Sequence, residues 1–285
     1  MFSLPLLLQC SLLDLPFLPA EKVGPGPELA LLLLGSGLTR GGSSSAASCS
    51  GGQPGAPAYL ADTVTSAPGS GGGGQFDDPA RATNGVCGAG LTAGSLDVYS
   101  LEQTGSRSVL TLEWAGKKVT NGTGVDFVVF ENAFRISGSA TALFMDPTIV
   151  EISRDNTKYC GFAPDYTGSP ETSYSNNPSH WSGFAGRSAV LYNAATNVLD
   201  ADALFDAAQA GGDGFDLSSL SDSNAAGTGC DTAERNALQS QGFLYVRLTA
   251  ATARNNPDTG AAFVSDSAST GPDIDGIVAR YLADR

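Results

Sequence analysis

Acidic residues in glycine-rich segments are the side chains of this sequence best suited to chemistry. Two such segments are Gly211-Gly-Asp-Gly-Phe-Asp-Leu217 and Gly271-Pro-Asp-Ile-Asp-Gly276. Ca²⁺ takes about six to eight oxygen ligands, and glycine lets a loop turn its carbonyls toward an ion. Glu131 and Asn132 end a β-rich run and could add side-chain oxygens from a rigid support. We therefore predict one structural calcium site that draws on Asp213, Asp216, Asp273, Asp275 and Glu131.

Each acidic segment also has an ordinary structural interpretation. Asp213 and Asp216 could belong to turns or caps, since aspartate accepts hydrogen bonds from nearby backbone N–H groups. The first segment partly matches a calcium-binding nonapeptide repeat, but the match occurs once and Ser218 stands where a large apolar residue is required. The second contains a fragment of an EF-hand loop without its later glutamate. Glu131 and Asn132 could instead form a buried hydrogen-bonding pair that holds a loop.

Catalytic arrangements have little support in the sequence. Glu131 and Glu151 could flank a glycosidic bond, but this chemistry requires a separation of about 5–9.5 Å, which a sequence does not specify. A Ser-His-acid site could use only His180, the one histidine, and the chain contains no Gly-x-Ser-x-Gly segment and no P-loop. The cysteines also lack the CxxC spacing of zinc sites. We therefore predict a protein that is not an enzyme.

Aromatic residues in the polar stretch 165–188 could bind a sugar ring by stacking. Trp181 and Tyr166 are the candidate ligand-binding residues of this stretch. Exposed rings would form such a platform, because an aromatic face packs well against an apolar sugar face. The alternative is that Trp181 is buried and anchors the loop to the core.

Three cysteines, Cys87, Cys160 and Cys230, lie in the body of the chain. In an oxidising compartment two of them could pair. We predict a disulfide between Cys160 and Cys230, although sequence alone does not determine connectivity.

Residues 1–50 have the ingredients of a signal for export as a lipoprotein, in an irregular order. An apolar run at 29–34 is followed by Arg40, by small residues and then by Cys49, which is the predicted site of lipidation. Cys10 is the alternative anchor, and a misassigned start or shifted reading frame is the alternative to a signal. No apolar run is long enough for a membrane-spanning helix. Residues 51–75 are rich in Gly, Ser and Pro and are predicted to be a flexible tether.

Composition narrows the class of partner. The formal net charge is −14 and the sequence pI is about 4.3. Binding to a phosphate backbone requires patches of Lys and Arg, so a nucleic-acid partner is excluded. An acidic surface fits an exported protein, or one that meets divalent cations. We expect contact with a membrane only through a lipid anchor.

Short apolar runs separated by Gly, Asn, Asp and Pro fill residues 76–285. Residues 108–114 alternate, with Leu110, Leu112 and Trp114 on one face, as in a half-buried strand. Helical periodicity is confined to residues 200–208. This pattern predicts an all-β fold, a single antiparallel β-sandwich of jelly-roll type with long glycine-rich loops and at most one or two short helices. Further strands are predicted at 126–130, 147–153, 158–162, 243–249 and 275–281, with a hairpin turn at 154–157.

Residues 126–134, Asp-Phe-Val-Val-Phe-Glu-Asn-Ala-Phe, form the most distinctive string. The string resembles the signature of a family of bacterial secreted or cell-surface proteins, often lipoproteins, of unknown function. Further matches follow in the family's order, at 146–153, at Gly183-Phe-Ala-Gly186 and at the two acidic segments. The resemblance spans about Tyr59 to Tyr281. It implies a surface-exposed β-sandwich and implies no known activity.

Together these features predict an exported cell-surface protein of the bacterial outer membrane or cell surface, either lipid-anchored or secreted. Its role would be that of a non-enzymatic interaction or adhesion module, stabilised by calcium, with a surface protein or a glycan as its partner. The alternative is a carbohydrate-binding module or a degenerate glycan-active enzyme. A groove lined by aromatic platforms would favour sugar binding, and one lined by opposed carboxylates would favour hydrolysis. A groove with neither feature would favour a scaffold.

Overall fold

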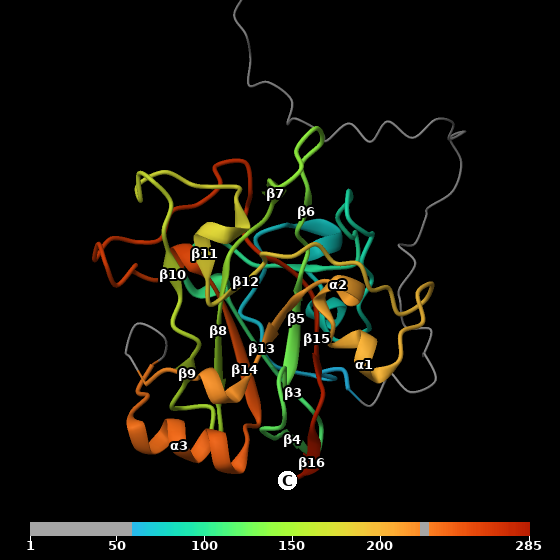
Figure 1. Cartoon of the computed structure of the whole chain (residues 1–285), viewed down its shortest axis with the longest axis vertical. Helices are drawn as coiled ribbons and strands as arrows, with labels where there is room; N and C mark the ends of the chain where they lie inside the picture. Colours follow the sequence, from blue (N-terminus) through green and yellow to red (C-terminus); the bar gives the residue numbers. More distant parts are fainter. Residues whose placement is uncertain (1–58, 223–227) are drawn as a thin grey trace, which may run out of the picture. The chain divides into compact units, whose positions relative to one another are not determined.

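The computed structural model describes residues 59–222 and 228–285, which belong to one compact unit, Ser44–Arg285. Strands are the main regular structure of the described residues, which contain few helices (Figure 1). Every pair of named strands is antiparallel. The prediction of an all-β, antiparallel fold is therefore confirmed.

The larger sheet has six strands in the order β1-β3-β14-β8-β12, with β9 also paired to β8. Its long central strands are rich in Val, Ile and Leu, which suit a pleated, buried surface. The strands are β1 (Thr63–Ser66), β3 (Val109–Glu113), β14 (Tyr245–Ala250), β8 (Thr148–Ser153), β12 (Phe184–Ala185) and β9 (Cys160–Gly161).

The smaller sheet has four strands in the order β13-β5-β15-β2. The continuous apolar run of β5 is buried along its whole length, as expected for a central strand with both faces covered. The strands are β13 (Asp213–Phe215), β5 (Phe127–Glu131), β15 (Asp273–Ala279) and β2 (Tyr99–Ser100).

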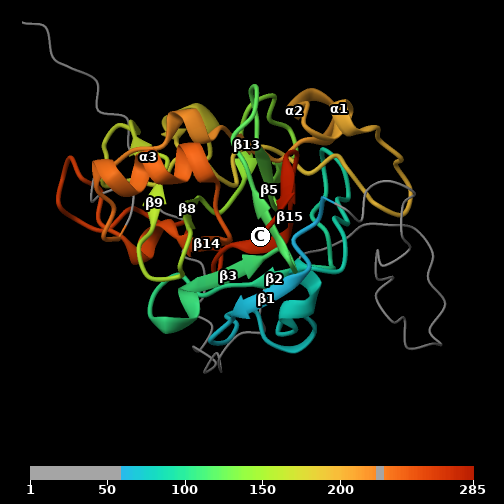
Figure 2. The same ribbon diagram turned by 90° about the horizontal axis from the view of Figure 1, so that it is seen from below.

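One hydrophobic cluster joins the two sheets. Leu110 of β3 and Leu248 of β14 belong to the same buried cluster as Phe127 and Val129 of β5 and Ile277 of β15. Figure 2 shows β5, β13 and β15 grouped together, with β1, β3 and β14 grouped beside them. The core therefore forms between the sheets.

Three two-stranded sheets form outside the two larger sheets. They are β10 (Asp165–Tyr166) with β11 (Trp181–Ser182), β6 (Phe134–Arg135) with β7 (Leu143–Phe144), and β4 (Lys117–Val119) with β16 (Leu282–Asp284).

The strands predicted from alternation and apolar runs correspond to β3, β5, β8, β9, β14 and β15. The predicted hairpin is also present, since Glu151 of β8 pairs with Gly161 of β9 across the turn at 154–157. These predictions are confirmed.

Helices are more numerous than predicted. The described residues form three α-helices, α1 (Ala201–Leu204), α2 (Ala207–Ala210) and α3 (Thr232–Gln241). The single helix predicted at 200–208 is divided because Asp206 accepts a bond from the Ala208 N–H and starts a second cap. Six 3₁₀ turns complete the set: η1 (Gly74–Phe76), η2 (Pro79–Ala82), η3 (Ser106–Ser108), η4 (Pro178–His180), η5 (Leu217–Ser219) and η6 (Ala251–Ala253).

The prediction of a tether at 51–75 is wrong for its described part. β1 pairs with β3, with Val64 opposite Leu112, and Ala61 is fully buried. The β-branched residues Thr63, Val64 and Thr65 explain this, because such side chains favour strands. Residues 1–50, with the predicted lipidation at Cys49, lie outside the described residues. Within the described residues, no helix is long and apolar enough to cross a membrane.

Candidate functional site

Glu131 is the last residue of β5, and its side chain is 2 % exposed. Its Oε1 accepts a hydrogen bond of 3.3 Å from the Asp273 N–H, since β15 runs beside β5 with Ile274 opposite Glu131. Its Oε2 is buried and has no hydrogen-bond partner among the described residues. An unsatisfied buried carboxylate oxygen is costly, so this atom requires an explanation.

The charges of three aspartates raise the pKa of Glu131, and we call the four carboxyl groups together the acidic centre. Asp213 and Asp273 come from β13 and β15 of the smaller sheet, whereas Asp146 precedes β8 of the larger sheet. The acidic centre therefore draws on both sheets at the edge of the core. Its members are Glu131, Asp146, Asp213 and Asp273.

Hydrogen bonds from neutral side chains hold Asp146 and Asp273 in place. Asp146 accepts bonds from Ser269 Oγ at 2.6 Å and from Gln103 Nε2 at 3.4 Å. Asp273 accepts a bond from the hydroxyl of Ser100. The orientations of these two carboxylates are thus set by neutral donors, which supply no compensating charge.

Asp213 differs because it has a cationic neighbour. It accepts bonds from the Arg187 N–H at 2.8 Å and from Ser188 Oγ at 3.0 Å, and Arg187 Nε lies 3.7 Å from its Oδ1. Of the four carboxyl groups in the acidic centre, Asp213 is the only one for which the described residues supply an ion pair.

The electrostatic environment raises the pKa of these carboxyl groups. Burial raises the pKa of Glu131 well above its usual value, and the charges of Asp146, Asp273 and Asp213 raise it further. Burial raises the pKa of Asp146 to about 7; the charges of Asp273 and Asp266 raise it further, and the hydrogen bonds from Ser269 and Gln103 offset part of the increase. A bound cation would oppose both effects.

Gly186 allows oxygen atoms to approach one another in this centre. Its φ of 89° is in the left-handed region. A Cβ there would lie 2.7 Å from the Asp146 carbonyl oxygen and 3.0 Å from Glu131 Oε2. These two oxygens therefore converge on the space beside Gly186, which explains why this loop ends in glycine.

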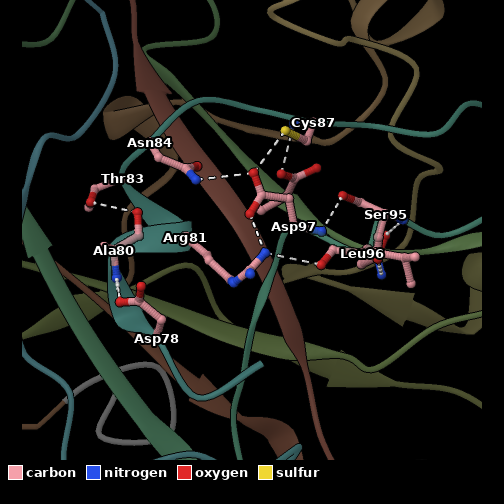
Figure 3. Close-up of polar contacts among 11 residues, drawn as sticks. Asp78, Ala80, Arg81, Thr83, Asn84, Cys87, Ser95, Leu96 and Asp97 are labelled. Carbon is pink, nitrogen blue, oxygen red and sulfur yellow. Dashed lines mark hydrogen bonds and ion pairs between the residues drawn. The ribbon is translucent and has the colours of Figure 1, made fainter. Parts of the chain in front are cut away.

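A second polar cluster lies around Asp97 and is shown in Figure 3. Arg81 forms an ion pair with Asp97, and Asn84 Nδ2 donates to it over 3.1 Å. Asp275, at the bulge of β15, accepts a bond of 2.8 Å from the Cys87 N–H. Burial raises the pKa of Asp275 well above its usual value, with a smaller contribution from the charge of Asp97.

The predicted calcium ligands are thus divided among three places. Glu131, Asp213 and Asp273 share the acidic centre, and Asp275 belongs to the cluster around Asp97. Asp216 caps η5 and accepts a bond of 2.8 Å from the Ser218 N–H, as its alternative interpretation expected. In the part of the chain that the structure describes, no three His, Cys, Asp or Glu side chains are arranged so that they could hold a metal ion.

Asn132 holds a loop, as the alternative interpretation of the Glu131-Asn132 pair expected. Its Nδ2 donates to the Ser95 carbonyl oxygen over 3.0 Å and its Oδ1 accepts from the Ser95 N–H. Glu131 takes no part in these two bonds.

Asp146 is the member of the acidic centre that the sequence analysis missed as a site residue. The available signal was its place directly before Pro147 and the following strand, which puts an acidic side chain at a strand entrance. Asp97 carried no comparable signal, since Arg81 and Asn84 come from an earlier segment of the chain and Asp275 from β15, near its end.

Glu151, the other half of the predicted carboxylate pair, has a different environment. It is fully buried, and Arg247 contacts it with two bonds of 2.8 Å. Arg254 adds a bond of 2.7 Å to Glu151 Oε2. Both oxygens of this carboxylate are therefore bound by guanidinium groups.

The aromatic residues predicted to bind sugar are buried, which corrects that prediction. Trp181 is 0 % exposed and Tyr166 is 1 % exposed. Their ring centroids lie 4.0 Å apart, and Trp181 Nε1 donates to the Ser175 carbonyl oxygen over 2.9 Å. The rings leave no face for a ligand because they pack against each other, so Trp181 anchors the loop.

The predicted disulfide between Cys160 and Cys230 is confirmed, with the two Cα atoms 5.0 Å apart. It connects β9 to the segment before α3. The predicted anchor Cys49 and its alternative Cys10 lie outside the described residues.

Comparisons of the chain with protein-family models, with curated proteins and with solved structures gave no match.

Proposed function

We propose that this chain is an exported cell-surface protein, a non-enzymatic interaction or adhesion module whose acidic centre binds calcium. We also propose that its two sheets form a β-sandwich of jelly-roll type, and that it belongs with the lipoprotein family that its Asp126–Phe134 string resembles. The observation that carries the functional proposal is the buried Oε2 of Glu131, which has no hydrogen-bond partner among the described residues and lies among carboxyl groups of which only Asp213 has a cationic neighbour.

Export is supported by the disulfide between Cys160 and Cys230. Such bonds form and persist in oxidising compartments and are rare in the cytosol. The sandwich is supported by the hydrophobic cluster that side chains of both sheets share.

Calcium binding is supported by the chemistry of the acidic centre. Carboxylate and carbonyl oxygens are the ligands that this hard cation prefers, and Glu131 Oε2 and the Asp146 carbonyl oxygen approach the same space beside Gly186. Among the described residues, the carboxylates lack metal-ligand spacing. Ion binding would therefore draw the side chains of Glu131 and Asp146 together, and the gain is relief of their mutual repulsion.

The test is thermal unfolding of the purified chain in EDTA and then with added calcium. We expect calcium at 100 times its Kd to stabilise the protein by about 2.7 kcal/mol, because it binds only the folded state. Glu131→Gln should lose this response. Asp216→Asn is the matched control, since Asp216 caps η5 outside the centre, and it should keep the response. An unchanged melting temperature on adding calcium to the unsubstituted protein would refute the calcium site.

The alternative function, a carbohydrate-binding module, loses its aromatic platform because Trp181 and Tyr166 are buried. Sugar binding would have to use another surface.

A further inference from the structure

A groove lined by three cations shares no residue with the acidic centre. Its volume is about 300 Å³, and it lies against one face of α3, because Glu234 and Gln241 are about two helical turns apart. Figure 1 shows α3 and the C-terminus at the same end of the described residues. We call this pocket the basic groove; its polar lining residues are Lys118, Arg154, Asp155, Glu234, Gln241 and Arg285.

The basic groove is lined by more cations than acids, although the whole chain has a negative net charge. The chain has a net charge of −14, yet three cations and two acids line this one pocket. Among the basic residues that the structure describes, those without an ion pair to a carboxylate are Lys118, Arg135 and Arg154. Two of these three unpaired cations therefore line the same groove.

These two cations are not explained by the end of the adjacent helix. Lys and Arg near a helix C-terminus often bond its last carbonyl groups. No hydrogen bond joins the side chain of Lys118 or Arg154 to α3 in the described residues. The C-terminus of α3 is instead closed by the Gly242 N–H, which donates to the Leu238 carbonyl oxygen over 2.9 Å. The charges of Lys118 and Arg154 are thus available to a ligand.

The groove is held rigidly by the backbone around it. Gly242 has a φ of 81°, and a Cβ there would lie 2.1 Å from the Val119 carbonyl oxygen of β4. This close approach fixes the end of α3 against β4. Asp155, which also lines the groove, accepts bonds through its Oδ1 from the N–H groups of Thr157 and Lys158, which keep its pKa at about 2.

The remaining polar groups match a ligand that carries hydroxyl groups as well as an anion. Asp155 is ionised at neutral pH, and Asp155 and Glu234 can accept bonds from hydroxyl groups. The Gln241 amide can both donate and accept. A simple anion would be repelled by the two acids, whereas a sugar acid would use both kinds of group. A pocket of about 300 Å³ also suits a ligand of monosaccharide size.

We propose that the basic groove binds a uronic acid unit of an acidic glycan, with the carboxylate held by Lys118 and Arg154 and the hydroxyl groups by Asp155, Glu234 and Gln241. This inference names a partner for the proposed interaction module and rests on that function. It does not depend on calcium.

The test compares methyl glucuronide with methyl glucoside, which differ only in the carboxylate. Binding to the full chain is followed by NMR chemical shifts or calorimetry. We expect the glucuronide to bind at least about tenfold more tightly, since a charge-assisted hydrogen bond is worth about that factor. Lys118→Ala and Arg154→Ala should each weaken binding roughly tenfold.

Lys158→Ala is the matched control, because Lys158 pairs with Asp231 and does not line the groove. It should leave binding unchanged. Circular dichroism and the melting temperature verify that each variant is folded. Equal binding of the two sugars, equal loss in Lys158→Ala, or binding of inorganic phosphate or a polyglutamate peptide as tight as that of the glucuronide would overturn the proposal. A calcium-dependent melting shift on the same preparation separates this failure from failure of the proposed function.

Discussion

Glu131 and Glu151 are both buried glutamates on long central strands, but their environments have opposite signs. Glu151 lies in β8 between the guanidinium groups of Arg247 and Arg254. Glu131 ends β5 among carboxyl groups, and one of its oxygens has no partner in the described residues. Burial is nearly the same for the two residues, so burial alone does not distinguish a structural ion pair from a candidate binding site. The charge of the neighbours does.

The largest expected effect comes from removing the charge of Glu151. Glu151→Gln leaves two partly buried guanidinium groups without a carboxylate, which should lower the free energy of unfolding by about 3–5 kcal/mol. Urea denaturation followed by circular dichroism measures this change. Glu113→Gln is the control, because Glu113 pairs with Arg285 near the surface and its loss should cost less than about 1 kcal/mol. Equal losses in the two variants would remove the contrast.

The pH dependence of stability tests the acidic side of the comparison. The pKa of Asp146 is about 7 in the folded protein against 3.8 for the unperturbed group, so the folded state binds more protons between these pH values. The calcium-free protein should therefore be most stable near pH 4. It should lose up to about 4 kcal/mol as the pH rises to 7.

Calcium should reduce this loss, since it favours the ionised carboxylates. Urea denaturation at a series of pH values, with EDTA and with calcium, measures both curves. A calcium-free stability that rises from pH 4 to pH 7 would contradict the raised pKa of Asp146.

A smaller effect of opposite sign is expected at Glu131. Without calcium at pH 7, Glu131→Gln should raise the free energy of unfolding, by less than Glu151→Gln lowers it, because it removes a buried group whose ionisation is opposed by burial and by neighbouring carboxylates. The same substitution type therefore stabilises at 131 and destabilises at 151. Asp216→Asn, outside the centre, should stay within about 0.5 kcal/mol. If Glu131→Gln destabilises the protein as Glu151→Gln does, the difference between the two glutamates is refuted.

Most of the longer strands could be predicted from the sequence, whereas most of the helices could not. Alternation at 108–114 and the apolar run at 126–130 are local patterns, and both became strands. α3 was missed because its residues are mostly polar and only Leu238 is buried, so it has no apolar stripe. β1 was missed because a short β-branched segment lay between glycine-rich stretches.

Only part of the candidate site could be predicted from the sequence. Glycine and aspartate in one segment identified Asp213 and Asp273, but the same reasoning also selected Asp216, which caps a turn. The sequence contained no sign that Asp146 approaches Glu131 or that Arg247 and Arg254 neutralise Glu151. These contacts join residues that are distant along the chain.

The sequence by itself determined the all-β character of this protein, the positions of its main strands and its acidic charge, because these depend on local alternation and on composition. Tertiary structure decided which carboxyl groups are neutralised. The charge state of a buried group depends on neighbours brought together across sheets, and the energy of such contacts falls off with distance in space rather than along the chain.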